Sequence, residues 1–278
     1  MRKENQRLQR QRVWEVDAYR GLNILLILIL HMYITVDSFC IDGYYKIDSY
    51  AFVDAVDPYH LFFDWNGDGV IYRAAFNPMI IAIWIQLVVS SLFFTSGVCC
   101  SFSKNGMNRV LRLFAAGLFV SVFTFGLYLW TGDEQRFIRF GALMCHACCH
   151  LIFYGLLEKR SNTFLVALAI PIIIGGYYLM KNPIYTNSGI LYAFGFRQNG
   201  VTNGDHIPLL PFLGWMLLGV VCGRVVYPQK KSILHVPWLE KLTRPLQWMG
   251  RYGGQIYVAH IVVYAVVFSA IGYIFHLF

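Results

Sequence analysis

Apolar residues are gathered along the chain into seven long runs, separated by shorter stretches that hold most of the charged side chains. Each run is about 18 to 25 residues long, the length that an α-helix needs to cross the hydrocarbon core of a bilayer. Lipid offers no hydrogen-bond partners to the backbone, which favours helices in such runs. The pattern therefore predicts an all-α, polytopic membrane bundle with helices near residues 21–39, 78–102, 111–130, 138–157, 163–180, 208–227 and 253–275.

The composition agrees with a protein of the cell membrane. Hydrophobic residues make up 57% of the chain, charged residues 14%, and the mean hydropathy is +0.51. Soluble domains carry about 25% charged residues. No polar stretch is long enough to fold separately, so we expect residues 1–278 to form a single membrane-embedded domain. The net charge of +8 is spread over loops and does not imply nucleic-acid binding.

The basic residues also predict an orientation. The basic N-terminal tail (residues 1–20) and the alternate loops on its side hold 17 of the 23 Lys and Arg residues, and the opposite loops hold six. The positive-inside rule then places the N-terminus in the cytoplasm and, after seven crossings, the C-terminus outside. The longest connection, residues 41–77, becomes an acidic, aromatic-rich outer loop. No small-x-small cleavage site follows the first run near residues 36–41, so we interpret that run as a retained span.

The first run carries an unusual pair of side chains, Arg20 where it begins and His31 at mid-depth. Ionisable residues within a membrane are costly and usually functional. Eleven residues of α-helix make almost three full turns, so Arg20 and His31 project from the same face about 16 Å apart. Asp17 lies one turn before Arg20, close enough to orient its guanidinium group.

Several motifs, in this order along the chain, resemble a known family. The helix with Asp17, Arg20, Gly21 and His31 is similar to the first helix of the transmembrane acyltransferases, the superfamily that includes the acyltransferase-3 enzymes. Later motifs resemble the branch related to the catalytic domain of heparan-α-glucosaminide N-acetyltransferase. These are LFFTSG at residues 92–97, FGALMCH at 140–146, DHIPLLPFLG at 205–214, and GR at 250–251 followed by IYVAH at 256–260.

The resemblance implies an acetyl (acyl) transferase. Its donor would be cytoplasmic acetyl-coenzyme A, and its acceptor the hydroxyl or amine of an extracytoplasmic glycan or amino sugar. Arg20, supported by Asp17, would bind the coenzyme A phosphates, and the thioester would approach His31. His31 would act as a general base on the acceptor or as a nucleophile that carries the acetyl group, and the sequence leaves both roles open.

His146 and Asp205 also belong to the implied site. His146, in the FGALMCH motif, either positions the acceptor or the thioester, or forms a hydrogen bond between helices; His260 has the same two interpretations. Asp205 precedes Pro208 and Pro211, which break regular hydrogen bonding at the outer entrance of the sixth run. It either binds the acceptor or caps the helix that follows.

A metal site is not expected. The i,i+4 pairs Cys145/Cys149 and His146/His150 are offset by about 100° around a helix, whereas zinc takes three or four ligands that converge on one point. Residues 64–69 resemble the start of a calcium-binding loop, but the twelfth position of that loop is an alanine where a bidentate Glu is required.

Ser96 is not predicted to be a nucleophile. It lies in the Thr95-Ser96-Gly97 step, which lacks the strand-turn-helix context and the first Gly of a nucleophile elbow. We expect Gly97, together with Gly219, to permit close packing of membrane helices.

A transporter is the alternative from another functional class. In that interpretation His31, His146 and His260 would form an intramembrane path for protons or substrate. Transporters of this kind usually show interrupted helices in both halves of the chain. Here one interrupted segment is evident, at Pro208 and Pro211.

Overall fold

The computed structural model describes residues 13–40, 78–103, 106–132, 137–198 and 206–274, and these are mainly helical. Their long helices are α2 (Trp14–Cys40), α5 (Pro78–Phe102), α6 (Gly106–Thr131), α7 (Ala142–Ile152) with the π-helix η2 (Phe153–Leu157), α8 (Asn162–Lys181), α10 (Leu209–Val226) and α13 (Gly253–Ile274). Shorter elements are β1 (Tyr185–Thr186), α9 (Gly189–Phe194), β2 (Arg197–Gln198), α11 (Pro237–Leu242) and α12 (Arg244–Arg251).

The seven predicted runs coincide with these seven long helices, so the prediction of an all-α membrane bundle is confirmed. Two boundaries differ. Helix α2 begins at Trp14, so Asp17 and Arg20 are part of the helix and not of a tail. Helix α7 begins at Ala142 and not near residue 138, because residues 137–141 are not helical and Gly141 is extended at the N-cap.

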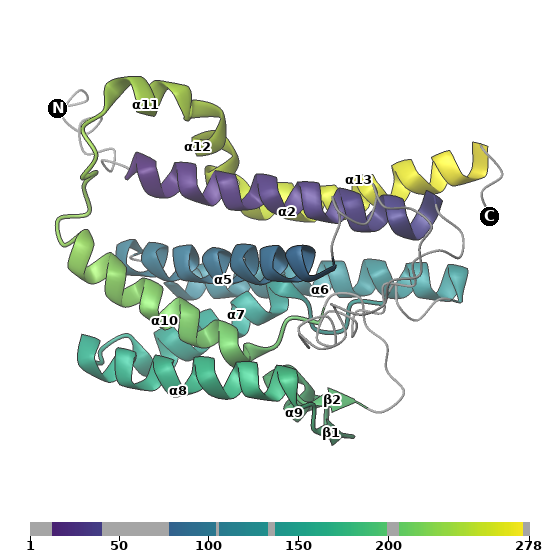
Figure 1. Cartoon of the computed structure of the whole chain (residues 1–278), viewed down its shortest axis with the longest axis horizontal. Coiled ribbons are helices and arrows are strands. Elements are labelled where there is room, and N and C mark those ends of the chain that lie inside the picture. The colour runs from purple at the N-terminus through teal and green to yellow at the C-terminus, as the bar shows by residue number, and fades with distance from the viewer. Residues whose placement is uncertain (1–12, 41–77, 104–105, 133–136, 199–205, 275–278) are drawn as a thin grey trace.

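The helices form layers (Figure 1). α2, α12 and α13 lie together in one layer, α5, α6, α7 and α10 lie beneath it, and α8 packs against α10 on the far side. The approach of α5 to α10 is close: a Cβ atom added at Gly97 would lie 1.9 Å from the carbonyl oxygen of Met216, and one at Gly219 would lie 1.9 Å from that of Phe94. Small residues thus let two backbones touch, as the sequence predicted.

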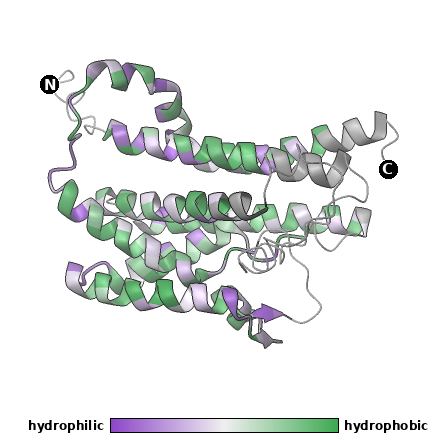
Figure 2. Cartoon of the chain, viewed as in Figure 1, coloured by the Kyte–Doolittle hydropathy of each residue, from purple (hydrophilic) through white to green (hydrophobic). Residues whose placement is uncertain are grey.

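The inside and the outside of the bundle are both apolar. Phe93, Leu165 and Met216 are completely buried between α5, α7, α8 and α10. Among the described residues, α5, α6, α8 and α10 contain stretches long and apolar enough to cross a membrane, and α7 with η2 and α13 contain shorter apolar stretches (Figure 2). The lipid-exposed face of α6 carries Leu111, Leu118, Val122 and Leu129.

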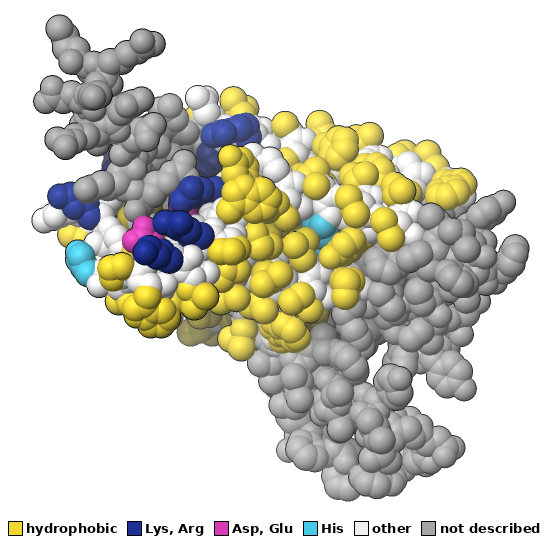
Figure 3. Space-filling model, turned by 90° about the horizontal axis from the view of Figure 1, so that it is seen from above, with side chains coloured by type: hydrophobic (Ala, Val, Ile, Leu, Met, Phe, Trp, Pro, Cys, Tyr) yellow, Lys and Arg dark blue, Asp and Glu magenta, His cyan; other side chains and the backbone are white. Residues whose placement is uncertain are grey.

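Basic residues gather at one end of the molecule (Figure 3). The segments counted on the basic side meet there. Arg224 donates from Nη2 to the carbonyl oxygen of Glu158 at 2.6 Å and from Nη1 to that of Arg160 at 2.9 Å. Trp14 Nε1 donates to the carbonyl oxygen of Leu234 at 3.3 Å. These segments therefore share one end of the bundle, and its assignment to the cytoplasm stays a prediction of the charge count.

The opposite end contains the two short strands, which pair in parallel with Tyr185 opposite Arg197. At the start of α10, Leu210 has non-helical backbone angles, as expected beside Pro208 and Pro211. Gly176 of α8 packs against this break: a Cβ added there would lie 2.4 Å from Pro211 N. The backbone of α8 thus covers the break on that side. Residues 1–12, the loop 41–77 and Asp205 lie outside the described residues.

Candidate functional site

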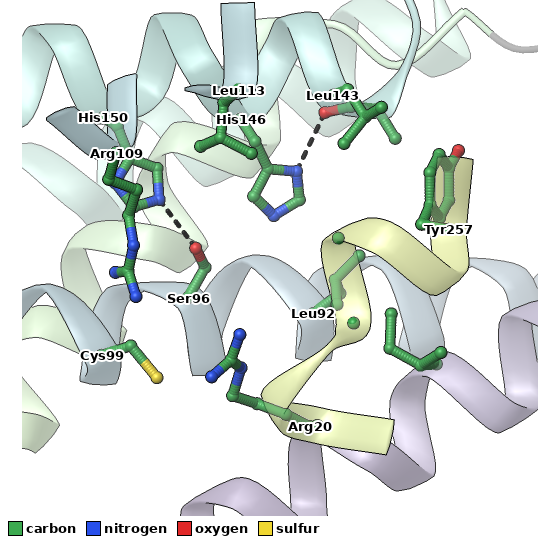
Figure 4. Close-up of a pocket in the computed structure, with 15 residues that line it drawn as sticks. Arg20, Leu92, Ser96, Cys99, Arg109, Leu113, Leu143, His146, His150 and Tyr257 are labelled. Atoms are coloured by element: carbon green, nitrogen blue, oxygen red, sulfur yellow. Dashed lines mark hydrogen bonds between the residues drawn. The ribbon is translucent and has the colours of Figure 1, made fainter. Parts of the chain in front are cut away.

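A cavity of about 130 Å³ opens between α2, α5, α6, α7 and the turn that joins α12 to α13. We call it the donor cavity, because of the role that we propose for it. Its wall includes apolar side chains such as Leu92, Leu113 and Tyr257. Polar side chains from four helices point toward its interior (Figure 4), and these are Arg20, Ser96, Cys99, Arg109, His146 and His150.

Arg20 is held in this wall by local packing of α2 on α12. Asp17 Oδ1 lies 3.8 Å from Arg20 Nη1, and Asp17 Oδ2 lies 3.5 Å from Arg251 Nε. The helices approach so closely that a Cβ at Gly21 would lie 1.7 Å from the carbonyl oxygen of Leu246. A Cβ at Gly250 would likewise lie 1.9 Å from the carbonyl oxygen of Asp17. Gly21 therefore allows α12 to pack closely on α2, and the Asp17 carboxylate, which contacts an arginine from each helix, holds the two helices together.

Arg109 is a second cation on the same wall, and the sequence analysis counted it only as a loop charge. It projects from the first turn of α6, and its Nη1 atom is buried without a hydrogen-bond partner among the described residues. A buried guanidinium donor that lacks a partner is costly. Because Arg matches the geometry of phosphate and carboxylate oxygens, Arg20 and Arg109 together suit an anionic ligand.

His146 lies on the cavity wall with a defined tautomer. Its Nδ1 atom is 2.9 Å from the carbonyl oxygen of Ala142, which can only accept, so Nδ1 carries the proton. The ring stacks on Phe93 with centroids 3.7 Å apart. In the neutral ring Nε2 then has a free electron pair, and the labelled side chain points into the cavity (Figure 4). This arrangement can accept a proton from a bound group.

His150 follows one turn later on the same helix, with its ring centroid 6.4 Å from that of His146. Its Nε2 atom lies 2.8 Å from Ser96 Oγ, and its Nδ1 atom lies 3.4 Å from Cys100 Sγ. The sequence analysis treated His150 only as a potential metal ligand. Its i,i+4 spacing from His146 was the available signal, since such residues share a helix face.

His31 lies farther along α2 and does not line the donor cavity. Its Nδ1 atom is 2.6 Å from Nε2 of His260 on α13, so one ring donates a proton to the other. The rings stack with centroids 4.9 Å apart. Tyr257 contacts both rings edge-on and also lines the cavity, so it lies between the cavity and this histidine pair. Within the described residues, Arg20 and His31 therefore do not share one cavity.

Asp205 lies outside the described residues, but its neighbour His206 is described and partly buried. The His206 ring stacks on Tyr192 of α9 with centroids 4.0 Å apart, and Nε2 donates to the carbonyl oxygen of Tyr192 at 2.9 Å. Burial lowers the pKa of His206 from 6.5 to about 4, against the opposing effect of that hydrogen bond. His206 is therefore packed against α9 beside the start of α10.

The residues considered for a metal have other partners. Cys145 donates to the carbonyl oxygen of Pro208, while His146 and His150 bond Ala142 and Ser96. In the described part of the chain, no three His, Cys, Asp or Glu side chains are placed to hold a metal ion.

Comparison with known proteins identifies the family. Residues 52–262 match the family described as heparan-alpha-glucosaminide N-acetyltransferase, catalytic. The matched range contains Ser96, Arg109, His146 and His150, and it begins after α2, so it does not include Arg20 or His31. No curated protein and no solved structure matches the chain. Because the family match covers most of the sequence, this multi-pass membrane protein belongs to the heparan-α-glucosaminide N-acetyltransferase catalytic family and is an acetyltransferase.

Proposed function

We propose that the protein transfers an acetyl group from cytoplasmic acetyl-coenzyme A to a hydroxyl or amine of an extracytoplasmic glycan or amino sugar. The observation that carries this proposal is the donor cavity, where two guanidinium groups and a neutral imidazole face the same space at the basic end of the bundle. A polyanionic thioester matches this combination. Neutral solutes would not require two arginines in one small cavity.

Arg20 and Arg109 bind the anionic part of the donor in this proposal. Arg109 has a buried donor atom without a partner among the described residues, and Arg20 is oriented by Asp17. A phosphate oxygen would satisfy Arg109 Nη1 and form charge-assisted hydrogen bonds with both groups. The acyl end of the donor then extends along the cavity toward His146 and Tyr257.

His146 acts as the general base. Its Nδ1 proton is committed to Ala142, so Nε2 can take the proton of the acceptor hydroxyl or amine as that group attacks the acetyl carbon. Stacking on Phe93 holds the ring in place. The general base is thereby directed at the acetyl end of the donor.

His31 and Asp205 serve the acceptor side. His31 and His260 are hydrogen-bonded to each other just beyond Tyr257, so the pair can orient the acceptor there. Asp205 directly precedes His206 in the sequence, and its carboxylate is the proposed ligand of an amino-sugar acceptor. The position of His31 disfavours it as the residue that carries the acetyl group, because Tyr257 separates it from the donor cavity.

The test uses purified protein in lipid vesicles, acetyl-coenzyme A as donor, and glucosamine or glucose as acceptor. Arg20→Gln and Arg109→Gln should each raise the KM for acetyl-coenzyme A about 10- to 150-fold, since a charge-assisted hydrogen bond contributes about 1.5–3 kcal/mol. Arg112→Gln is the matched control on α6, because Arg112 is exposed and bonds its own helix at Asn108. Continuous release of coenzyme A in the presence of acceptor with no acetylated acceptor formed, or vesicle uptake of solute without acetyl transfer, would overturn the proposal.

A further inference from the structure

Ser96, His150 and Cys100 form an arrangement that the acetyl transfer proposed above does not use. Ser96 Oγ lies 2.8 Å from His150 Nε2, and His150 Nδ1 lies 3.4 Å from Cys100 Sγ. Ser96 and His150 both line the donor cavity, and Ser96 is partly exposed whereas His150 is fully buried. A nucleophile within hydrogen-bond reach of a base, with that base oriented by a third group, is the geometry of covalent catalysis.

The absence of a nucleophile elbow around Ser96 does not exclude this chemistry. The elbow is the way in which one sheet-containing fold exposes a serine, and such sites are recognised by geometry and not by sequence context. Here Ser96 comes from α5 and His150 from α7, and the two side chains meet across the helix interface (Figure 4). The next residue, Gly97, lets α10 pack directly against α5.

We propose that Ser96 is the nucleophile that accepts the acetyl group from the donor, with His150 as its base. This step rests on acetyl-coenzyme A as the donor. It divides the transfer into two half-reactions, in which the acetyl group is first held on Ser96 and then passes to the acceptor near His146. His150 and His146 lie one turn apart and serve the first and second half-reaction respectively.

In the first half-reaction Ser96 Oγ attacks the thioester carbon, and its proton moves to His150 Nε2. For Nε2 to accept that proton, Nδ1 must carry hydrogen and donate to Cys100 Sγ, as the 3.4 Å separation allows. The carbon–sulfur bond then breaks, coenzyme A leaves as the thiol with the proton from His150, and the acetyl group remains as a Ser96 ester.

In the second half-reaction the acceptor hydroxyl or amine gives its proton to His146 Nε2 and attacks the ester carbon. The bond from Ser96 Oγ to the acetyl carbon breaks. The proton returns from His146 to Ser96 Oγ, so both side chains end in their starting states. No metal ion, oxidant or further co-reactant is needed for either half-reaction.

The decisive measurement is exchange of label between acetyl-coenzyme A and free coenzyme A in the absence of acceptor, because exchange requires an acetyl-enzyme. We expect exchange in the wild type, an acid-stable acetyl ester on the peptide containing Ser96, and parallel lines in initial-rate plots. Ser96→Ala should abolish exchange, and His150→Gln should slow it about 10²–10⁴-fold. Ser101→Ala is the control on the same helix, since that hydroxyl bonds its own backbone at Val98.

A second variant separates chemistry from folding. Ser96→Cys should retain exchange and carry the acetyl group as a thioester, which neutral hydroxylamine cleaves while the wild-type ester resists it. The inference is overturned if the wild type acetylates the acceptor without exchange, if Ser96→Ala with unchanged thermal unfolding keeps full transfer, or if the label resides on His31 or Cys99. A wild type that transfers no acetyl group at all refutes the proposed function instead.

Discussion

The two ends of one stripe on α2 lie in different surroundings. Arg20 faces the donor cavity, where the other polar side chains are a second guanidinium group, two histidines, a serine and a cysteine. His31, eleven residues later, meets the imidazole of His260 instead. Tyr257 of α13 lines the cavity and contacts both imidazoles, so one aromatic side chain divides the stripe. Sharing a helix face therefore does not mean sharing a site, because the packing helix decides where a cavity ends.

The largest effect that would test this division is expected at His146. Replacing it with Ala should lower kcat about 10²–10⁴-fold, since the general base is lost. The KM for acetyl-coenzyme A should change little in His146→Ala and also in His31→Ala, because neither imidazole binds the phosphates. His235→Ala, an exposed histidine at the basic end, serves as the control. A raised KM for acetyl-coenzyme A in His31→Ala would show that His31 and Arg20 belong to one site.

The next effect concerns the wall that carries Arg20. Gly21→Ala should destabilise the protein by about 1–3 kcal/mol, because the added methyl group overlaps the backbone of Leu246 and must displace α12. It should also raise the donor KM by moving Arg20. Gly175→Ala is the matched control on α8, where an added Cβ meets nothing within 4 Å. Thermal unfolding in detergent together with initial rates checks both expectations, and unchanged values in Gly21→Ala would contradict the packing described for α12.

A double-mutant cycle in the transfer rate can sharpen the comparison further. His31→Ala and His260→Ala should be coupled by about 0.5–3 kcal/mol, as expected for side chains in direct contact. His31→Ala and His146→Ala should combine almost additively, since Tyr257 separates them. Strong coupling in the second cycle would mean that the three histidines act as one chain, which is what the transporter interpretation requires.

The smallest effect is expected from low pH, which should reduce thermal stability through His206 at the end opposite the basic residues. The pKa of His206 is lowered to about 4 in the folded protein from an ordinary 6.5. As the pH falls, the unfolded chain therefore binds this proton before the folded protein does. The contribution of His206 to the free energy of unfolding is fully present above pH 6.5 and is lost between pH 6.5 and about 4. The unfolding temperature of His206→Gln should fall less over this range. An equal fall in both proteins would show that His206 does not control it.

The fold followed from the sequence wherever an element was long and apolar. The seven runs required only the length of a span, and all seven are helices. The short helices α11 and α12 were not predicted, because six and eight residues give little periodicity to recognise. The start of α7 was placed too early, since Phe137, Ile138 and Phe140 are apolar without being helical.

The site could be predicted from the sequence only in part. Arg20 and His146 could be selected because a charge or an imidazole in an apolar run is conspicuous by itself. Arg109 and the bond from Ser96 to His150 depend on how α5, α6 and α7 are rotated against one another. A single sequence indicates which residues share a face of a helix, but it does not indicate which other helix packs against that face. The prediction that Arg20 and His31 line one site also depends on helix packing, because Tyr257 of α13 lies between them.

The close contact of α12 with α2 has a mechanical consequence for ligand exchange. Gly21 and Gly250 bring the two backbones into contact, so Arg20 and the beginning of α13 must move as one rigid unit. Arg109 belongs to α6 in the other layer. An anion bound between the two guanidinium groups, as we propose for the acetyl donor, would therefore link one layer of helices to the other.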